Sequence, residues 1–148
     1  MNIIKAIQIA QQKKKDRGYE YLYWCIDIHG VILTPTYNRL NEGADLYEHC
    51  IPTLQLISED QSNKVILWSS SYRKPMTDIR DMLSEFGIRV NFINCNPDYT
   101  KTDICDFTDK FYFDILLDDK AGFEPEKDWG AIRSFLLSKF PTIRKDSV

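Results

Sequence analysis

The apolar residues of this chain alternate between short continuous runs and stripes at helical spacing. The continuous runs are rich in aromatic and β-branched residues, which is typical of buried strands. They are Tyr21–Asp27, the run KVILWSSS, Arg89–Ile93 and the run KFYFDILLDDKAGF. Strands that are apolar on both faces and alternate with helices predict an α/β protein, a three-layer Rossmann-like fold with a mostly parallel sheet.

The stripes at helical spacing predict helices between and around the strands. They span residues 3–15, 43–60, 75–86 and 129–139. Pro52 must either kink the second of these helices or begin a new one, and Gly87 ends the third. The Asn, Pro and Asp content of the segment NCNPDYTKTD is typical of a loop. Helices therefore separate the first three strands, and a loop leads toward the fourth.

The length of the chain limits it to one domain. At 148 residues it can bury a hydrophobic core but has no room for two domains of ordinary size. We therefore expect one domain over residues 1–148, with a helix within residues 1–18 and an α/β core in residues 19–148. The gaps after the first and second strands are too short to hold a cap domain, so we expect an open site.

The composition excludes several classes of partner. A hydrophobic fraction of 43% is that of a soluble globular protein, and a net charge of -3 gives no general attraction for nucleic acid or anionic membrane. No stretch approaches the ~20 apolar residues of a membrane span. Lys13–Lys15 follow the first apolar stretch rather than precede it, which argues against a signal peptide. We expect a cytoplasmic protein without a membrane anchor.

The cysteines and histidines do not suggest a zinc site. The four cysteines are scattered without a C-x-x-C pair, so we expect them to be reduced and mostly buried. His29 and His49 are far apart in sequence, and neither stands beside a suitably spaced cysteine pair.

The informative polar residues lie at the strand ends. Asp27 ends the first strand, Ser69 the second, and Asp118 and Asp119 the fourth, with Lys110 just before the fourth. Right-handed crossovers bring such ends to one edge of the sheet, where α/β proteins bind ligands. Carboxylates gathered there repel one another unless a hard divalent cation lies among them, and oxygen ligands favour Mg²⁺. A serine and a lysine beside the cation would hold a phosphoryl group, which an aspartate can attack.

In these motifs the chain resembles the haloacid dehalogenase superfamily. WCIDIHGVI is similar to the first motif, D-x-D-G-(T/V), with His29 in place of the second aspartate. VILWSS is similar to the second motif, and DKFYFDILLDDKAGF to the third and fourth motifs placed close together. The arrangement is similar to that of the deoxyribonucleotidases and of small cap-less bacterial members. The resemblance covers residues 21–123, which is most of the chain.

The resemblance implies a metal centre and a nucleophile. Asp27 would be the nucleophile and a ligand of Mg²⁺, together with the backbone carbonyl of His29 and with Asp118. Asp119 would support the metal directly or through water. The family's general acid and base stands at the position of His29, and histidine is itself a competent acid and base near neutral pH. We therefore expect an Mg²⁺-dependent phosphatase that forms an aspartyl-phosphate on Asp27.

The resemblance also implies a phosphate site. Ser69, Ser70 and Lys110 would bind the phosphate oxygens, and Lys110 would neutralise charge that develops during transfer. Lys101 lies in the preceding loop and could serve instead of Lys110. Turn formation is an alternative explanation for the serines, and it is stronger for Ser70 and Ser71 than for Ser69.

The substrate is less defined than the chemistry. We expect a phosphorylated small molecule or a nucleic-acid end, and the similarity to deoxyribonucleotidases favours a nucleotide or a polynucleotide end. Arg73 and Lys74 either contact the substrate phosphate or lie in a solvated loop. Because His29 replaces an aspartate, a catalytically weak or silent phosphate-binding module is the alternative function. The sequence predicts no oligomeric state.

Overall fold

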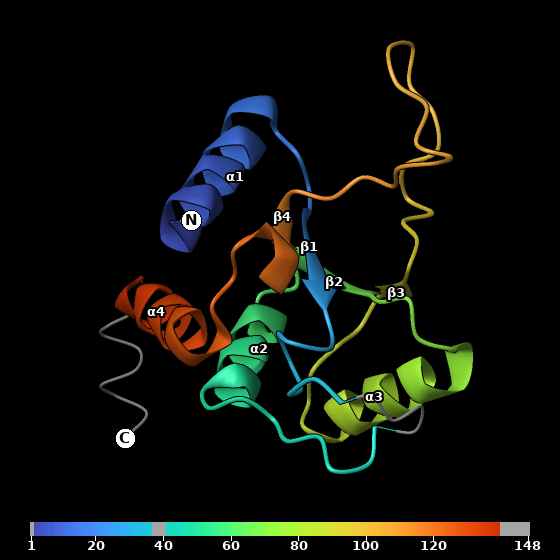
Figure 1. Ribbon diagram of the computed structural model, residues 1–148. Helices are drawn as coiled ribbons and strands as arrows, with labels where there is room; N and C mark the ends of the chain where they lie inside the picture. The colour runs from blue at the N-terminus through green and yellow to red at the C-terminus, as the bar shows by residue number, and fades with distance from the viewer. Residues whose placement is uncertain (1, 37–40, 140–148) are drawn as a thin grey trace.

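The computed structural model describes residues 2–36 and 41–139, which form an α/β fold (Figure 1). The helices are α1 (Ile3–Arg17), α2 (Cys50–Glu59), α3 (Arg73–Glu85) and α4 (Pro125–Ser138). The strands are β1 (Leu22–Asp27), β2 (Asn63–Trp68), β3 (Phe92–Ile93) and β4 (Ile115–Leu117), and a single 3₁₀ turn, η1 (Asp119–Ala121), follows β4. Within the described ranges, no helix has the length and apolar character needed to cross a membrane.

The strands form one parallel sheet in the order β3-β2-β1-β4. β1 lies in the interior of the sheet, and Ile26 near its end pairs with Leu67 of β2 on one side and with Leu117 of β4 on the other. Connections between parallel strands must cross over the sheet, so all four strands end at the same edge. This confirms the predicted α/β fold with a parallel sheet.

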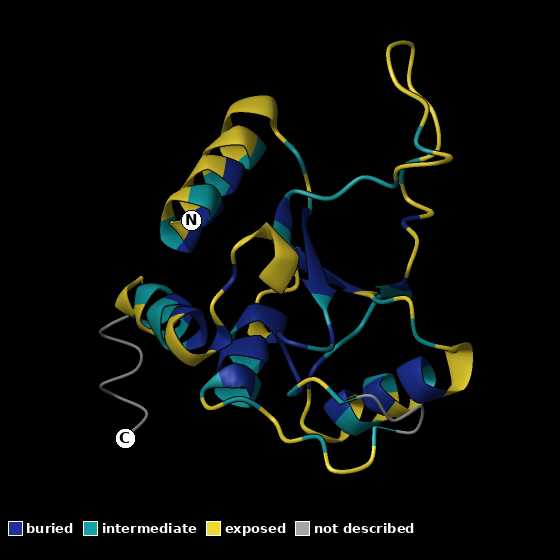
Figure 2. Cartoon of the chain, in the orientation of Figure 1, coloured by how far each residue is buried: buried dark blue, intermediate teal, exposed yellow. Residues whose placement is uncertain are grey.

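One face of the sheet carries the main hydrophobic core. Trp24 and Ile26 of β1, both 0% exposed, belong to a buried cluster that also includes side chains from α1, α2, α3 and α4. The helices are buried on the side that meets this cluster and exposed on the other (Figure 2). Within the core, the Trp24 indole N–H donates to the Asn63 side chain (3.0 Å), whose amide donates to the Ile57 carbonyl (3.0 Å). The polar atoms buried with these rings are therefore satisfied.

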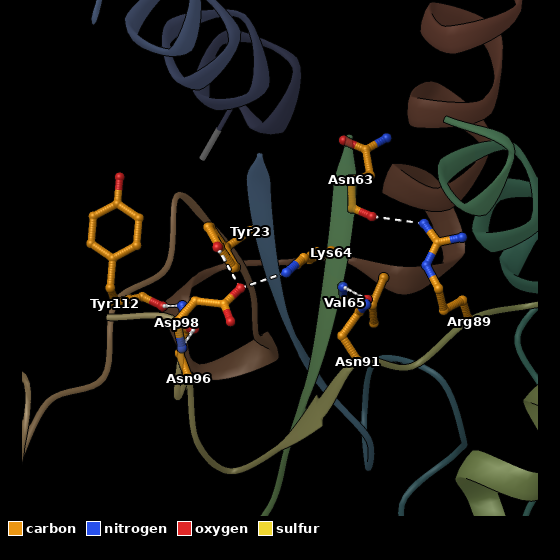
Figure 3. Close-up of polar contacts among 9 residues, drawn as sticks. All are labelled: Tyr23, Asn63, Lys64, Val65, Arg89, Asn91, Asn96, Asp98 and Tyr112. Carbon is orange, nitrogen blue, oxygen red and sulfur yellow. Dashed lines mark hydrogen bonds and ion pairs between the residues drawn. The ribbon is translucent and has the colours of Figure 1, made fainter. Parts of the chain in front are cut away.

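The opposite face of the sheet is covered by the connection between β3 and β4, residues 94–114. Tyr23 of β1 is 2% exposed, its hydroxyl donates to the Asp98 carboxylate (2.7 Å), and its ring meets Tyr112 edge-on. Lys64 of β2 pairs with the same carboxylate, so two neighbouring strands hold one side chain of the connection (Figure 3). The third layer of the fold is therefore an aromatic, irregular segment.

Three predicted helices begin at other residues in the structure, among them α3, which begins at Arg73 instead of residue 75. Residues 43–49 were expected to be helical, but α2 begins only at Cys50 and Pro52 lies in its first turn, where a missing N–H costs little. The preceding segment instead pairs with the loop after β1, since the Tyr47 N–H donates to the Ile32 carbonyl (3.2 Å). α4 begins at Pro125, ahead of the predicted start at Trp129.

The cysteines are all free, as predicted, but only two of them are buried. Cys25 lies within β1 and Cys50 at the start of α2, and both are inaccessible to solvent. Cys95 and Cys105 are exposed because they lie in the connection between β3 and β4. The prediction of mostly buried cysteines was wrong for this pair.

Candidate functional site

The structure brings three aspartates together at the carboxyl edge of the sheet, as the sequence predicts. Asp27 is the last residue of β1, and Asp118 directly follows β4. Because Ile26 pairs with Leu117, the next residue of each chain, Asp27 and Asp118, emerge side by side. One carboxylate oxygen from each of Asp27, Asp118 and Asp119 lies within 4.8 Å of the others. We refer to these three residues as the acidic cluster.

A glycine allows Asp119 to approach the loop after β1. Gly30 has a positive φ of 83°, and a Cβ atom built on it would lie 2.5 Å from Asp119 Oδ2. Both the backbone conformation and the close approach therefore require glycine at this position. The loop is fixed from the helical layer, because the Trp129 indole N–H donates to the Val31 carbonyl (2.7 Å).

Asp118 is oriented by the turn that follows it. Its side chain accepts a hydrogen bond from the Lys120 N–H (2.9 Å) and caps η1. Its carbonyl accepts from the Phe123 N–H (3.1 Å), and the Phe123 ring packs on Trp129 with 5.2 Å between centroids. One carboxylate oxygen of Asp118 is thus engaged in the turn, which leaves the other available to a ligand.

The electrostatics of the acidic cluster favour a bound cation. Burial first, and then the negative charges of Asp118 and Asp119 and a hydrogen bond that the protonated Asp27 donates to Asp119, raise the pKa of Asp27 to about 7, although the Ile28 N–H opposes the shift. Asp27 therefore resists ionisation when no positive charge is near. Three carboxylates that supply hard oxygen atoms fit a divalent cation such as Mg²⁺, which would remove this repulsion.

The hydroxyl of Ser69 lies at the neighbouring strand end and is engaged in a turn. It accepts a hydrogen bond from the Ser71 N–H (3.0 Å) and contacts the Ser71 hydroxyl (3.0 Å). Ser69 is half-buried and Ser70 is exposed. The sequence offered phosphate binding and turn formation as alternative roles for these serines, and the structure shows the turn.

Asn94 positions the backbone of Ser69, a contact that sequence reasoning missed. Its side-chain oxygen accepts from the Ser69 N–H (2.9 Å) and its side-chain nitrogen donates to the Ser69 carbonyl (2.8 Å). Asn94 therefore continues the pairing between β2 and β3 with its side chain, and its φ of 54° lies in the left-handed region that asparagine tolerates better than most residues. The available signal was an asparagine directly after a predicted strand.

His29 lies in the tight turn after β1 and is half-buried. Its Nε2 atom lies 2.5 Å from the side-chain oxygen of Asn41. With the amide oxygen facing it, Nε2 is the donor, which leaves Nδ1 as the nitrogen that can accept a proton. The ring is therefore held in one orientation by a neutral partner.

The structure gives Lys110, which is exposed, no ion pair with an aspartate of the acidic cluster among the described residues. Its neighbour Phe111 meets the ring of Trp68 at the carboxyl end of β2, with 5.4 Å between centroids. Asp114, just before β4, accepts from the Tyr23 N–H (2.8 Å) near the amino end of β1, so the chain from Phe111 to Asp114 runs along the sheet. Lys101 forms an isolated antiparallel backbone pair with Asp106 in the same connection. The phosphate-binding role expected of Lys110, or of Lys101 in its place, stays a prediction.

Comparisons with known proteins support the fold of this chain and give no information on its chemistry. No protein-family model matches the chain, and a search of curated proteins finds no match. Among solved structures, the chain is similar to a conserved protein of Bacteroides thetaiotaomicron, with 22% identity and a TM-score of 0.59. The match covers 80% of this chain and 92% of that one. A likeness at this identity shows a shared fold, and membership of the haloacid dehalogenase superfamily stays a prediction.

The raised pKa of Asp27 predicts a pH-dependent cost to stability. Its pKa is about 7 in the folded protein against an ordinary value of 3.8, so its contribution to stability is complete below the lower value and is lost as pH rises through the higher one. We expect the metal-free variant Asp27→Asn, which cannot ionise here, to melt several degrees above the wild type at about pH 8 and to match it near about pH 4. Thermal unfolding in chelator measures both differences.

Millimolar Mg²⁺ supplies the control for this experiment. It should raise the Tm of the wild type at the higher pH by mass action and raise that of Asp27→Asn less, since one ligand is gone. An equal Tm difference between the two proteins at both pH values would contradict the account of the cluster.

The contact of Asn94 predicts a selective effect on phosphate binding. If Ser69 binds phosphate, Asn94→Gly should weaken inorganic phosphate binding while Mg²⁺ binding is retained, because glycine keeps the positive φ and removes the two side-chain hydrogen bonds to Ser69 together with a weak contact to the Met76 sulfur (3.6 Å). Each bond contributes roughly 0.5–1.5 kcal/mol to stability. Calorimetric titrations with each ligand measure the two affinities.

Asn91 offers a matched control on the same pair of strands. Its side chain accepts from the Val65 N–H (2.9 Å), three residues before Trp68 along β2 (Figure 3). Asn91→Ala should lower the Tm and leave phosphate affinity unchanged. Equal phosphate affinity in Asn94→Gly and the wild type would show that Asn94 has no part in the site.

Proposed function

We propose that this protein is an Mg²⁺-dependent phosphatase or phosphotransferase of the haloacid dehalogenase type that acts on phosphomonoesters through Asp27. The observation that carries the proposal is the acidic cluster, in which oxygens of Asp27, Asp118 and Asp119 lie within 4.8 Å of one another beside the strand end that bears Ser69. The resemblance of the last motifs to deoxyribonucleotidases favours a nucleotide or polynucleotide end as substrate.

The first step would transfer the phosphoryl group to the protein. A carboxylate oxygen of Asp27 attacks phosphorus, the bond from phosphorus to the leaving oxygen breaks, and an aspartyl-phosphate forms. Mg²⁺ held by Asp118 and Asp119 would supply charge stabilisation to the phosphoryl oxygens. The Ser69 hydroxyl would turn from Ser71 to the phosphate.

The second step would return Asp27 to its starting state. Water attacks the phosphorus of the aspartyl-phosphate, phosphate leaves, and the Asp27 carboxylate is regenerated. His29 is the candidate for protonating the leaving oxygen in the first step and for taking a proton from water in the second. Its Nδ1 is suited to this exchange because Nε2 is engaged by Asn41.

Arg73 is a further candidate, beside Lys110, for the positive charge that balances the phosphate. Arg73 begins α3, four residues after Ser69, and is exposed, whereas its neighbour Lys74 pairs with Asp78 (3.1 Å). A guanidinium at the start of the helix can bind phosphate oxygens in a bidentate manner. We therefore propose that Arg73 binds the phosphate together with Lys110.

The central test of this proposal is the loss of the nucleophile. Asp27→Asn should lower turnover of a generic phosphomonoester by several orders of magnitude, and chelator should have the same effect on the wild type. Phosphate release is the measurement, and circular dichroism checks that the fold persists. Asp109→Asn, a change of the same kind at an exposed position of the β3–β4 connection, should keep full activity. Turnover in Asp27→Asn equal to that of the wild type would refute the proposal.

A second candidate function is a phosphate-binding module that has lost the chemistry. One observation favours it: His29 stands where the family has an aspartate. Such a module would bind phosphorylated ligands with Mg²⁺ and release no phosphate.

The variant His29→Asp separates the two candidates. We expect slow turnover in the natural protein, with hydrolysis of the aspartyl-phosphate impaired at least as much as its formation, because an imidazole differs from a carboxylate in reach and direction. Phosphate release measured across about pH 5 to about pH 9 should be faster in His29→Asp if the natural protein is a weakened phosphatase. A slower variant would identify histidine as the working acid and base. If both proteins are inactive and bind phosphate, the module is the better description.

A further inference from the structure

Trp68 is an aromatic residue in an unusual position. Of the three tryptophans, Trp24 and Trp129 are 0% exposed, whereas Trp68 is 41% exposed. It ends the apolar strand β2 and directly precedes Ser69. A partly exposed indole at the end of an otherwise buried strand points to a functional role.

The register of the sheet places Trp68 beside the nucleophile of the proposed reaction. Trp68 and Asp27 are pairing partners in the parallel ladder between β1 and β2. Paired residues project from the same face of a sheet, and neighbouring strands lie about 4.8 Å apart. The indole therefore stands next to the Asp27 side chain, on the face turned away from the helices.

The β3–β4 connection covers the face of the sheet turned away from the helices and leaves Trp68 partly exposed. Tyr23 and Ile66, which project from the same face nearer the amino end, are 2% and 0% exposed under the β3–β4 connection. The ring of Trp68 meets Phe111 of that connection, with centroids 5.4 Å apart and planes at 63°. Phe111 in turn contacts Phe113 (6.1 Å). The indole is thus a ring surface that one aromatic contact supports, that is 41% exposed and that pairs in register with Asp27.

We propose that Trp68 is a stacking surface for a flat ring carried by the leaving group of the phosphate ester. The inference rests on the proposed function, because it takes the phosphate to lie between Asp27 and Ser69. A leaving group attached to that phosphate starts within reach of the residue that pairs with Asp27 and precedes Ser69. Stacking of a planar ring on an indole needs no hydrogen-bond readout, so it selects aromatic esters as a class over alkyl and sugar phosphates.

Tryptophan fluorescence tests the contact directly. Because Trp24 and Trp129 are buried, quenching by a bound ring ligand reports on Trp68. Phenyl phosphate, a nucleoside monophosphate and glycerol phosphate are titrated into the Mg²⁺-loaded wild type and into Trp68→Leu. We expect saturable quenching by the first two ligands in the wild type and none by glycerol phosphate. Calorimetric titration, which does not depend on the indole, should show weaker binding of the first two ligands to Trp68→Leu and equal binding of glycerol phosphate to both proteins.

Steady-state kinetics with the same esters measures the selectivity. Trp68→Leu should lower kcat/KM for the ring-bearing esters roughly tenfold and leave that for glycerol phosphate unchanged, whereas Trp68→Phe should keep most of the preference. Phe86→Leu is the matched control, because Phe86 is 45% exposed at the end of α3 and lies outside the strand ends. The ratio of phenyl phosphate to nucleotide turnover tells whether the ring alone or the nucleoside is preferred.

The outcomes for the stacking surface and for the phosphatase are distinguishable. If the wild type releases no phosphate, the proposed phosphatase fails, and quenching in the wild type together with weaker calorimetric binding of ring-bearing esters to Trp68→Leu still supports the stacking surface. Saturable binding of ring-bearing esters with equal affinity in wild type and Trp68→Leu overturns the surface while leaving the phosphatase intact. Absence of any saturable binding by ring-bearing esters overturns the surface as well.

Discussion

The pairing of β1 on both sides is the constraint on which the rest of the site depends. Ile26 is in register with Leu67 and with Leu117, so Asp27 emerges between the strand end that bears Ser69 and the one that bears Asp118. A slip of one residue in either ladder would turn every side chain of that strand to the other face. Trp24 and Ile26 are buried against the helices, and a slip would move both side chains out of that core. Their burial therefore opposes a slip. The hydrophobic core therefore sets the geometry of a charged cluster that contributes nothing to it.

The close placement of the three carboxylates lowers the stability of the metal-free fold. Burial and neighbouring carboxylates raise the pKa of Asp27, so near neutral pH the folded state must hold a partly ionised, self-repelling cluster. The repulsion is resisted by hydrogen bonds that fix the surrounding backbone, among them the bond from the Trp129 indole to the Val31 carbonyl and the bond that the Asp118 carboxylate accepts as the cap of η1. Energy stored in this way is released when a cation binds. Binding of a cation and resistance to unfolding are consequently linked in this fold.

The sequence predicted the residues whose position follows from strand periodicity and missed those whose position follows from side-chain contacts. Asp27, Asp118 and Asp119 were placed correctly because each lies within two residues of the end of a buried strand, and parallel strands end at one edge. The part of Lys110 stays a prediction, because its place depends on the path of the β3–β4 connection, which no periodic pattern specifies. Asn94 was missed for a related reason: it acts through two hydrogen bonds to Ser69, which is distant in sequence.

The two outer layers of the fold are attached to the sheet in different ways. The helical layer fixes the acidic cluster through the core, whereas the aromatic layer, residues 94–114, is fastened by polar contacts such as those of Asp98 with Tyr23 and Lys64. Polar contacts near the surface are weaker and more easily replaced than a packed core, so this layer can change in sequence without moving the aspartates of β1 and β4. Under the proposed function, the acidic cluster would act on the phosphate and Trp68, which ends β2 and meets this layer through Phe111, would contact the leaving group, since Asp27 and Trp68 form one register pair.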